Sequence, residues 1–435
     1  MPVASAGHVG RPGTALKVLV VGGGAREHAL AWKLSRASGI EDLYAAPGNP
    51  GMAGIASCVP IAADATVELA EFASSLRIDL TVVGPELPLV LGIADEFARR
   101  GLFVVGPSRA AAELEGSKVF TKEFCVRHGI PTARARVVRD RDEAAAAVKD
   151  LKVPVVFKAD GLAAGKGVQV CRGKDDVDAA LARYFEERAF GAAGEKVLVE
   201  ECLEGEEISF MVLADGTNVL PLASARDYKR LGDGDEGPNT GGMGSVSPAP
   251  MESGLAARIL RTIVHPTVAG LAAEGRPYRG VLYAGVMVTR QGPRLLEYNC
   301  RFGDPETQAV IPRLDGDLLP LLRAAAVGEL GTLRANWKRE ATVCVVLAAG
   351  GYPGTPKRGD ALAGLGEALA QPGVLLFHAG TALEDGRLVT AGGRVLSVVG
   401  RGATLDEAVR TAYSAVAQVK FDGMHYRTDI GQGLA

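Results

Sequence analysis

The stretch Leu295-Leu-Glu-Tyr-Asn-Cys-Arg-Phe-Gly-Asp-Pro-Glu-Thr-Gln308 changes from an apolar strand to a polar, glycine-containing turn within a few residues. Because side chains alternate faces along a strand, Glu297 and Asn299 point the same way, and Arg301 does too if the extended geometry persists. A carboxylate and an amide oxygen suit a Mg²⁺ or Mn²⁺ ion that keeps positions open for phosphate oxygens. A guanidinium suits a planar carboxylate or an acyl phosphate. The stretch therefore predicts nucleotide chemistry.

A second interpretation of the same residues is a strand that ends in a salt-bridged turn without a ligand. These residues alone do not distinguish the two interpretations. The rest of the chain has to decide between them.

Length and composition exclude several classes of protein. With 435 residues the chain is too long for one ordinary core, and about three domains are expected. The net charge of −3 gives no indication of a nucleic-acid or membrane surface, and no apolar run is long enough to span a bilayer. The six cysteines are scattered without a C-x-x-C pair, which argues against a zinc site and a disulfide framework. We expect a cytoplasmic enzyme without a nucleic-acid or membrane partner.

A glycine loop opens the first predicted domain. Residues 17–21 form an apolar run that leads into Gly22-Gly-Gly-Ala-Arg-Glu-His28, and residues 29–34 then have helical spacing. Strand, loop and helix in succession place backbone N–H groups and a helix N-terminus where a phosphate can bind. A tight turn without a ligand explains the loop equally well.

Further strands of the same kind follow at residues 43–49, 80–86 and 103–107, with helical stretches between them. Strands that alternate with helices predict a parallel sheet whose loops converge at one edge. Glu86 is then available to accept hydrogen bonds from sugar hydroxyls.

Two lysines are placed as ligands for an anion. Lys118 lies near the start of a helix that continues to about residue 126, which is an unfavourable position for a cation unless it reaches an anion. Lys158 ends an apolar strand and needs an anionic partner if it is buried. The glycine-rich segment from Gly161 to Gly167 follows it and can close over nucleotide phosphates as a flap. No Walker A motif is present, and a plain hairpin turn with a solvated lysine is the alternative for the flap.

The remaining segments complete the expected architecture. The strand at residues 197–203 can offer backbone groups to an adenine edge, with a downstream carboxylate for the ribose, although an ordinary hairpin explains it too. Residues 225–230 and 237–244 lack periodicity, and long loops in compact domains are usually functional. A strand at residues 280–289 should pair with residues 294–299. After Trp337 the pattern predicts a separate mixed α/β domain.

On these motifs the chain resembles the phosphoribosylamine–glycine ligases (glycinamide ribonucleotide synthetases) of the ATP-grasp superfamily. The resemblance runs from Lys17 to the end of the chain, and Arg301-Phe-Gly-Asp-Pro-Glu306 is the family's own signature. One departure is Ala25, where members of the family commonly carry a glycine. If that loop binds phosphate, the methyl group could shift the contact. Further segments that match the family are 22–28, 83–89, 114–121, 158–167, 237–244, 348–354 and 378–381.

The resemblance implies an α/β fold of the ATP-grasp type. We expect an N-terminal parallel-sheet substrate domain at residues 16–116 and an ATP-grasp domain at residues 117–337. The latter should contain a flexible lid at about residues 134–203. A mixed α/β C-terminal domain is expected at residues 338–435, and residues 1–15 are expected to be a disordered extension.

The resemblance also implies an enzyme of de novo purine synthesis. It would join glycine to 5-phosphoribosylamine through glycyl phosphate, convert ATP to ADP and phosphate, and act as a monomer. Its partners would be these small molecules, with Mg²⁺ or Mn²⁺ held by Glu297 and Asn299.

Individual residues receive roles by the same resemblance. Glu200 and Leu203 would offer backbone groups to adenine, and Glu207, or else Glu206, would contact the ribose. The residues expected to bind ATP are Lys118, Lys158, Gly161, Gly165, Lys166, Gly167, Glu200, Glu201, Leu203 and Glu207. Those expected to bind phosphoribosylamine or glycine are Gly22, Gly24, Ala25, Arg26, Glu27, Asn49, Gly84, Pro85, Glu86 and Gly242. The residues expected to act in catalysis are Arg301, Asp304, Asp227 and Lys229.

Within the catalytic set, Arg301 would stabilise the charge of the acyl phosphate. Asp304 or Asp227 would be the partner of a substrate amine, and the choice between them is open.

Two other functions remain possible from the sequence. One is a different ATP-grasp carboxylate ligase, such as a carboxylase component, which would not explain the signature at residues 301–306. The other is a nucleotide-binding regulatory protein without catalysis, although every charged group that the chemistry needs is present. ATP hydrolysis that depends on both glycine and the ribosylamine would separate the three.

Overall fold

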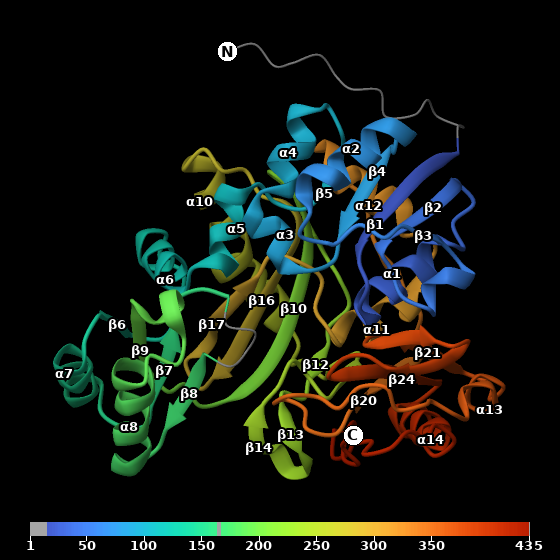
Figure 1. The fold of residues 1–435 in the computed structure, drawn as a ribbon. Coiled ribbons are helices and arrows are strands. Elements are labelled where there is room, and N and C mark those ends of the chain that lie inside the picture. The colour runs from blue at the N-terminus through green and yellow to red at the C-terminus, as the bar shows by residue number, and fades with distance from the viewer. Residues whose placement is uncertain (1–14, 163–166, 435) are drawn as a thin grey trace.

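The structure, a computed structural model, describes residues 15–162 and 167–434. In these ranges four sheets have four or five strands each, and Figure 1 shows them around a common centre. The expected extension lies outside the described residues except for Ala15. Within the described ranges no helix is both long and apolar enough to cross a membrane.

The N-terminal sheet is parallel, as predicted, with the strand order β3-β2-β1-β4-β5. Its central strand, β1 (Leu16–Gly22), packs one face against α1 and the other against α2 and α4. Burial on both faces explains why this strand is a continuous apolar run and does not alternate. The other elements are β2 (Ile40–Pro47), β3 (Ser57–Cys58), β4 (Leu80–Val83), β5 (Val104–Val105), α1 (Ala25–Leu34), α2 (Thr66–Leu76), α3 (Glu86–Leu91), α4 (Ile93–Arg99) and α5 (Arg109–Gly116).

Helix α1 begins at Ala25, earlier than the predicted start at residue 29. The Glu27 carboxylate accepts a hydrogen bond from the Gly24 N–H at 2.7 Å and so satisfies a free donor at the helix N-terminus. Residues 25–28 therefore form the first turn of the helix. The glycine loop is shorter than the sequence pattern suggests.

A small antiparallel sheet, here called the lid sheet, has the strand order β6-β9-β7-β8. Phe157 and Val199 face the helices α7 and α8, whereas Lys158 and Glu200 on the same strands face the opposite way. This alternation puts charge on one face of the sheet and core on the other. The elements are β6 (Ala135–Val138), β7 (Val155–Ala159), β8 (Val168–Cys171), β9 (Val197–Glu201), α7 (Arg141–Leu151) and α8 (Lys174–Leu181).

The central sheet is antiparallel with the strand order β11-β10-β16-β17. The predicted pairing of β16 (Arg279–Thr289) with β17 (Gly292–Asn299) is confirmed, and its register shifts next to Gly285, directly before Glu297. Helices α5, α6, α9 and α10 pack on one of its faces. The other elements are β10 (Glu206–Asp215), β11 (Val219–Pro221), α6 (Lys118–Arg127), α9 (Leu255–Ile259), the π-helical turn Leu260–Val264 and α10 (His265–Ala273).

The C-terminal sheet has the strand order β12-β15-β20-β24-β21. Its strand β12 (Arg226–Asp227) lies in the first stretch without periodicity, and β15 (Gly244–Ser247) begins at the last residue of the second. The sheet thus combines residues from both sides of Trp337, and the predicted domain limits stay a prediction. The other elements are β13 (Arg230–Gly232), β14 (Glu236–Asn239), β20 (Ala341–Ala348), β21 (Val374–His378), β22 (Thr381–Glu384), β23 (Arg387–Thr390), β24 (Arg394–Gly402), α13 (Leu365–Leu369) and α14 (Leu405–Val416).

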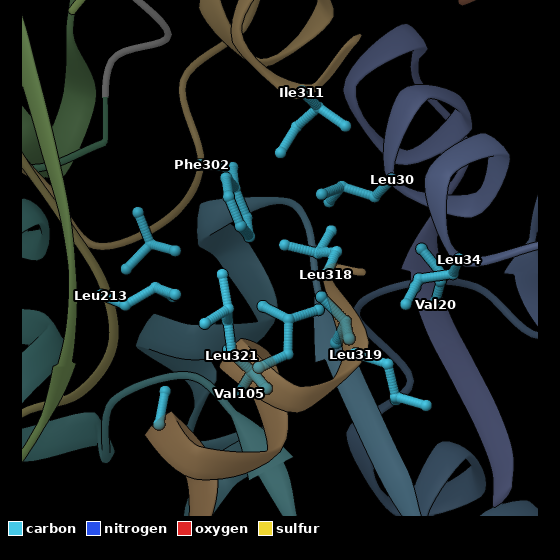
Figure 2. Packing of buried hydrophobic residues seen from close by; sticks show 14 of the residues in the cluster. Val20, Leu30, Leu34, Val105, Leu213, Phe302, Ile311, Leu318, Leu319 and Leu321 are labelled. Carbon is cyan, nitrogen blue, oxygen red and sulfur yellow. The ribbon is translucent and has the colours of Figure 1, made fainter. Parts of the chain in front are cut away.

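One apolar core joins the N-terminal sheet to the turn after β17. Phe302 packs among Leu30 of α1, Leu213 of β10, and Ile311 and Leu318 (Figure 2). Its side chain is 1% exposed. A phenyl ring fixed in a core holds its own backbone in place. The buried Phe302 ring therefore fixes the turn that carries Arg301 and Asp304. The helical elements beyond this turn are α11 (Glu306–Val310), the 3-10 turn Ile311–Arg313 and α12 (Leu319–Val327).

Candidate active site

A cleft of about 1000 Å³ lies between the lid sheet, the central sheet and the N- and C-terminal parts of the chain. It brings together most of the predicted site residues. Those that line it are Lys118, Lys158, Gly161, Gly167, Glu200, Glu201, Leu203, Glu207, Arg26, Pro85, Glu86, Asp227, Lys229, Glu297, Asn299, Arg301 and Asp304. Gly165 and Lys166 lie outside the described residues.

Lys158 has the anionic partner that its buried position requires. Its Nζ lies 2.8 Å from Glu200 Oε2, and Lys122 Nζ lies 2.9 Å from Glu200 Oε1. Burial raises the pKa of Glu200, but the two lysines outweigh burial and hold this pKa below its ordinary value. Two ammonium groups and one carboxylate leave one net positive charge on this wall, which suits a phosphate group.

Lys118 holds the start of the glycine-rich segment. Its Nζ donates to the Gly161 carbonyl at 2.8 Å, and the neighbouring Ser117 hydroxyl donates to Asp160 Oδ1 at 2.9 Å. Burial, compensated only in part by Glu297, lowers the pKa of Lys118. A phosphate placed beside this ammonium would favour its charged form.

The expected flap begins and ends at the cleft. Gly161 and Gly167 both line it, and the Tyr184 hydroxyl donates to the Gly167 carbonyl at 2.9 Å. The expected mobility of the flap concerns mainly residues 163–166, which lie outside the described residues. That expectation stays a prediction.

The expected adenine and ribose contacts lie at the far end of the cleft. The Glu201 carboxylate accepts hydrogen bonds from the N–H and the Nε of Arg134, both at 2.9 Å, so this side chain is already bound. Its backbone N–H also donates, to the Arg134 carbonyl at 3.0 Å. Glu207 forms an ion pair with Lys229, and Glu206 lies 3.4 Å from Arg226, so the choice between the two glutamates for the ribose stays open.

Glu297 and Asn299 line the cleft together. Burial raises the pKa of Glu297, but Lys229, Lys158 and Lys118 outweigh it and hold this pKa below its ordinary value. In the described ranges no cluster of three His, Cys, Asp or Glu side chains could hold a metal alone. A carboxylate and an amide oxygen fit Mg²⁺, which takes its other ligands from phosphates and water.

Arg301 does not lie on the strand face with Glu297 and Asn299, because β17 ends at Asn299. Its guanidinium is held between two carboxylates of the N-terminal part, 3.1 Å from Glu86 Oε2 and 3.3 Å from Glu115 Oε1. It also donates to Asn299 Oδ1 at 3.4 Å. The conditional expectation of a continuous strand is therefore wrong. The predicted proximity of Arg301 to the metal pair nevertheless holds.

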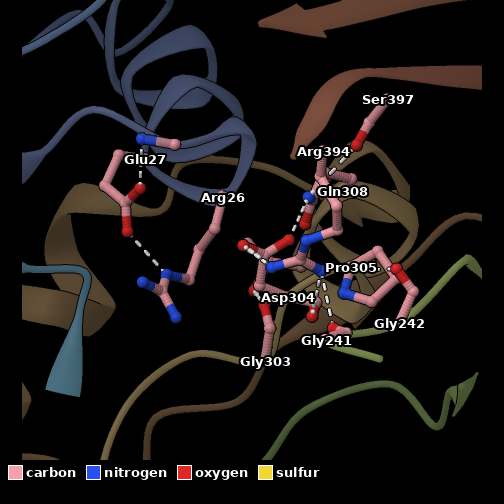
Figure 3. A network of polar contacts seen from close by, with 12 residues as sticks. Arg26, Glu27, Gly241, Gly242, Gly303, Asp304, Pro305, Gln308, Arg394 and Ser397 are labelled. Atoms are coloured by element: carbon pink, nitrogen blue, oxygen red, sulfur yellow. Dashed lines mark hydrogen bonds and ion pairs between the residues drawn. The ribbon is translucent and has the colours of Figure 1, made fainter. Parts of the chain in front are cut away.

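Asp304 accepts hydrogen bonds from two side chains. Its Oδ2 accepts from Arg394 Nη2 at 2.9 Å, and its Oδ1 accepts from Gln308 Nε2 at 2.7 Å (Figure 3). Burial raises the pKa of Asp304, but the Arg394 guanidinium outweighs it and holds this pKa below its ordinary value. Each oxygen of Asp304 thus already accepts one hydrogen bond from a side chain.

Asp227 differs from Asp304 in that one oxygen is free. Its Oδ1 is buried and has no hydrogen-bond partner among the described residues. Burial, followed by the charges of Glu306 and Glu207, raises the pKa of Asp227 well above its ordinary value. A buried carboxyl oxygen without a partner is costly, and a donor from a ligand would remove this cost.

The glycine loop of the N-terminal part is organised around the Glu27 side chain. A Cβ atom on Gly84 would lie 1.9 Å from Glu27 Oε1, and one on Gly22 would lie 2.5 Å from Glu27 Cγ. The Glu27 carboxylate also accepts from Arg26 Nε at 2.6 Å. These glycines therefore make room for Glu27. Only Arg26, Pro85 and Glu86 of this predicted set line the cleft, and Gly22, Gly24, Ala25, Glu27, Asn49, Gly84 and Gly242 do not.

Two residues of this set have structural contacts that explain their position. The Asn49 amide donates to the carbonyls of Gly23 and His378 at 2.9 and 2.8 Å, so it joins the glycine loop to the C-terminal part. Ala25 is 1% exposed and packs in an apolar cluster with Ala29 and Ala309. Its methyl group belongs to this cluster and does not line the cleft.

Comparison with protein families agrees with this geometry along nearly the whole chain. The model of the phosphoribosylglycinamide synthetase N domain matches residues 16–115, that of the ATP-grasp (A) domain matches residues 116–307, and that of the C domain matches residues 342–433. The chain belongs to the phosphoribosylglycinamide synthetase family. The ATP-grasp fold expected from the sequence is confirmed.

Individual relatives match nearly the whole chain. The phosphoribosylamine–glycine ligase of Rhizobium meliloti (strain 1021) is 51% identical over 417 residues, which are 96% of this chain and 98% of the relative. The crystal structure of the phosphoribosylamine–glycine ligase of Thermotoga maritima superimposes with a TM-score of 0.83 at 35% identity and covers 95% of this chain and 100% of its own.

A more distant structure shares the fold alone with the synthetase. The biotin carboxylase domain of the 2-oxoglutarate carboxylase of Hydrogenobacter thermophilus superimposes with a TM-score of 0.70 at 18% identity, covering 95% of this chain and 92% of its own.

Several charged or polar residues that line the cleft had no predicted role, among them Glu115, Lys122, Tyr352 and Arg394. Lys122 follows Lys118 by one helical turn, and this spacing on one helix face could have indicated it. Glu115 directly precedes the segment with Lys118. Tyr352 and Arg394 reach the cleft only through the packing of the C-terminal sheet, for which the local sequence carries no signal.

Proposed function

We propose that this chain is an ADP-forming ligase that joins glycine to 5-phosphoribosylamine and yields glycinamide ribonucleotide in de novo purine synthesis. The observation that carries the proposal is the position of Arg301. It lies beside the pair Glu297 and Asn299 in a cleft whose other wall carries Lys158 and Lys122. This arrangement suits phosphoryl transfer to a carboxylate. Membership of the synthetase family, whose relatives carry the ligase name, supports the choice of substrates.

The lysines of the cleft would bind and orient the ATP phosphates. A carboxylate is a poor acyl donor, and its phosphorylation gives glycyl phosphate with a good leaving group. Phosphoryl transfer needs positioning and neutralisation of charge more than covalent participation of the protein. Lys118, Lys122 and Lys158 supply fixed positive charge, and Arg301 offers a planar contact to the glycine carboxylate.

Glu297 and Asn299 would hold Mg²⁺ or Mn²⁺. When bound, the ion would neutralise phosphate charge and orient the phosphate oxygens. The chain's own part is to present one carboxylate and one amide oxygen at the cleft wall. Lys229, 3.6 Å from Glu297 Oε1, keeps this carboxylate in place.

We assign the contact with the substrate amine to Asp227 in preference to Asp304. Asp227 lines the cleft and has a buried oxygen without a partner among the described residues, whereas each oxygen of Asp304 already accepts one hydrogen bond. A hydrogen bond to Asp227 Oδ1 would satisfy that atom and would also take up the positive charge of an ammonium group.

We further propose a cytoplasmic, monomeric enzyme with no nucleic-acid or membrane partner. All six cysteines are free thiols, which fits a reducing compartment. Light scattering of the purified protein measures the oligomeric state directly.

The test of the proposal is ADP release by the purified chain with each substrate omitted in turn. ADP should form at a high rate only when ATP, glycine and 5-phosphoribosylamine are all present. ADP formation that requires bicarbonate and ignores glycine would indicate a carboxylase component. Nucleotide binding without ADP formation under any condition would indicate a regulatory protein.

A further inference from the structure

Arg394 belongs to none of the metal, phosphate and substrate contacts proposed for the cleft, although its guanidinium borders it. It is the first residue of β24, in the C-terminal sheet. Its Nη1 donates to the Gly241 carbonyl at 2.6 Å and to the Asp304 carbonyl at 3.0 Å, and its Nη2 donates to Asp304 Oδ2 at 2.9 Å. One side chain thus joins two turns that are far apart in the sequence (Figure 3).

Both turns border the predicted chemistry. Asp304 closes the segment that begins with Arg301. Gly241 precedes Gly242, where a Cβ atom would lie 2.8 Å from the free Asp227 oxygen. The backbone of Gly241 is held at both of its polar groups, because its N–H donates to the Tyr352 hydroxyl at 2.9 Å. Arg394 and Tyr352 therefore fix the relative position of the two turns from the C-terminal part of the chain.

The N-terminal part holds the same segment from the other side. Arg26 Nη1 donates to the Phe302 carbonyl at 3.2 Å. Arg26 comes from α1, whereas Arg394 comes from β24. Phe302 itself is buried in the core. A segment held by an arginine on each side and by a buried ring has little freedom, as a preorganised site requires.

We propose that Arg394 is a positioning residue for the ligase reaction. It sets the segment from Arg301 to Asp304 against the Gly241–Gly242 turn, so that the Arg301 guanidinium and the Asp227 carboxyl face the same bound glycine. The inference rests on the proposed function. The planar guanidinium is required because one group must serve two carbonyls and a carboxylate, which a single ammonium cannot do in this geometry.

The test compares Arg394→Gln and Arg394→Lys with Arg401→Gln, a substitution on the same strand at a residue that does not line the cleft. Both Arg394 variants should lose kcat/KM for glycine on the order of 10²-fold, as misplacement of reacting groups does, with Lys giving no rescue. The affinity for a non-hydrolysable ATP analogue, measured by calorimetry, should stay nearly unchanged. Arg401→Gln should behave as the wild type.

A double-mutant cycle separates positioning from simple stabilisation. The losses for Arg394→Gln and Asp304→Asn should be strongly non-additive in kcat/KM for glycine, since one contact is removed in both. A lower unfolding temperature with normal kinetics at temperatures where the variant is folded would overturn the inference. Additive losses would overturn it too.

Tyr352→Phe keeps the inference testable if Arg394→Gln does not fold, since it removes a single hydroxyl. It should raise the KM for glycine with little change in ATP-analogue affinity, and unchanged glycine kinetics would count against the proposal. If the wild type itself shows no glycine-dependent ADP release, the proposed function fails. A wild type that depends on glycine, with Arg394 variants that match it, refutes only the positioning role.

Discussion

Glu297 faces three lysines and an open cleft, and its role can be tested by removing its charge alone. Glu297→Gln keeps the size of the side chain but loses the anionic oxygen that a divalent ion needs. We expect turnover to fall by orders of magnitude and the apparent Mg²⁺ requirement to rise, with little change in the free energy of unfolding. Steady-state kinetics at several Mg²⁺ concentrations and calorimetric Mn²⁺ binding in the presence of ADP measure both effects.

The control for this variant is Glu204→Gln, which removes a carboxylate at an exposed position on the same part of the chain. Near-normal turnover of Glu297→Gln at ordinary Mg²⁺ concentration would exclude Glu297 as a metal ligand.

Arg301 should act on the chemical step more than on ATP binding. Lysine cannot reproduce its contacts with Glu86, Glu115 and an incoming carboxylate. Arg301→Lys should lower kcat and raise the KM for glycine, with a loss on the order of 10²-fold or more, as found for other preorganised donors. ATP affinity should stay nearly unchanged. If nucleotide binding collapsed while glycine dependence stayed normal, Arg301 would belong to the ATP site.

The sequence predicted those site residues whose role follows from the residues next to them in the chain. Lys118, Lys158 and the segment from Glu297 to Arg301 stand out locally, and the structure brings them to one cleft. Arg394 and Glu115 could not be found this way because their partners lie in distant parts of the chain. The partner of Lys158 was predicted only as a charge, and its identity, Glu200, required the pairing of β7 with β9.

The Gly241–Gly242 turn has a backbone conformation and close contacts that require glycine at position 242. Gly242 has φ of +107°, and a Cβ atom there would lie 2.3 Å from Pro305 Cδ. Gly242→Ala adds backbone strain and a steric clash, so we expect a loss of stability of about 1–3 kcal/mol together with reduced activity. Denaturant unfolding measures the first effect.

The matched control is Gly254→Ala. Gly254 also has a positive φ, +84°, but a Cβ atom there would meet nothing within 4 Å. The loss of stability in Gly254→Ala should therefore come from backbone strain alone and be smaller than the loss in Gly242→Ala. Equal losses for both variants would mean that Gly242 is not crowded as described.

Element types followed well from the sequence where the pattern was clear, as for β1, β16 and β17. The region from residue 225 to 247 did not, because its strands are short and two of them, β12 and β15, join a sheet formed mainly after residue 341. Short strands have little alternation to detect. Helix α1 started early because a capping contact, and not hydrophobic spacing, decides its first turn.

At the scale of the whole molecule, the buried His28 and the half-buried His378 join the N-terminal and C-terminal parts. His28 Nδ1 accepts the His378 N–H at 2.9 Å, and the His28 ring packs on Phe377. Burial, with a smaller contribution from His378, lowers the pKa of His28 to about 3, and burial lowers the pKa of His378 to about 4. The folded state therefore favours the neutral form of each imidazole ring.

This arrangement predicts a loss of stability in mild acid. Both pKa values are lower in the folded state than the unfolded value of 6.5, so the unfolded chain binds more protons. The stability is fully present above pH 6.5 and is lost as the pH falls toward 4 and then 3. Within this window each ring lowers the free energy of unfolding by up to about 1.4 kcal/mol for every pH unit. Denaturant unfolding between pH 7.5 and pH 5 measures the slope.

His28→Asn keeps an acceptor near the Nδ1 position and removes one titrating ring. Its free energy of unfolding should therefore change less steeply with pH than that of the wild type. His265→Asn, at an exposed position, should leave the slope unchanged. An identical slope in all three proteins would mean that the histidine pair does not control the pH dependence.

The central claim, that the cleft activates the glycine carboxylate by phosphorylation before the amide bond forms, has one direct test. Glycine labelled with a heavy oxygen isotope in its carboxylate is incubated with ATP, Mg²⁺, 5-phosphoribosylamine and the enzyme, and the released phosphate is analysed by mass spectrometry. The account predicts that one labelled oxygen per turnover appears in inorganic phosphate, because the carboxylate oxygen that attacks the γ-phosphorus leaves with it. Amide product formed with unlabelled phosphate would contradict the account.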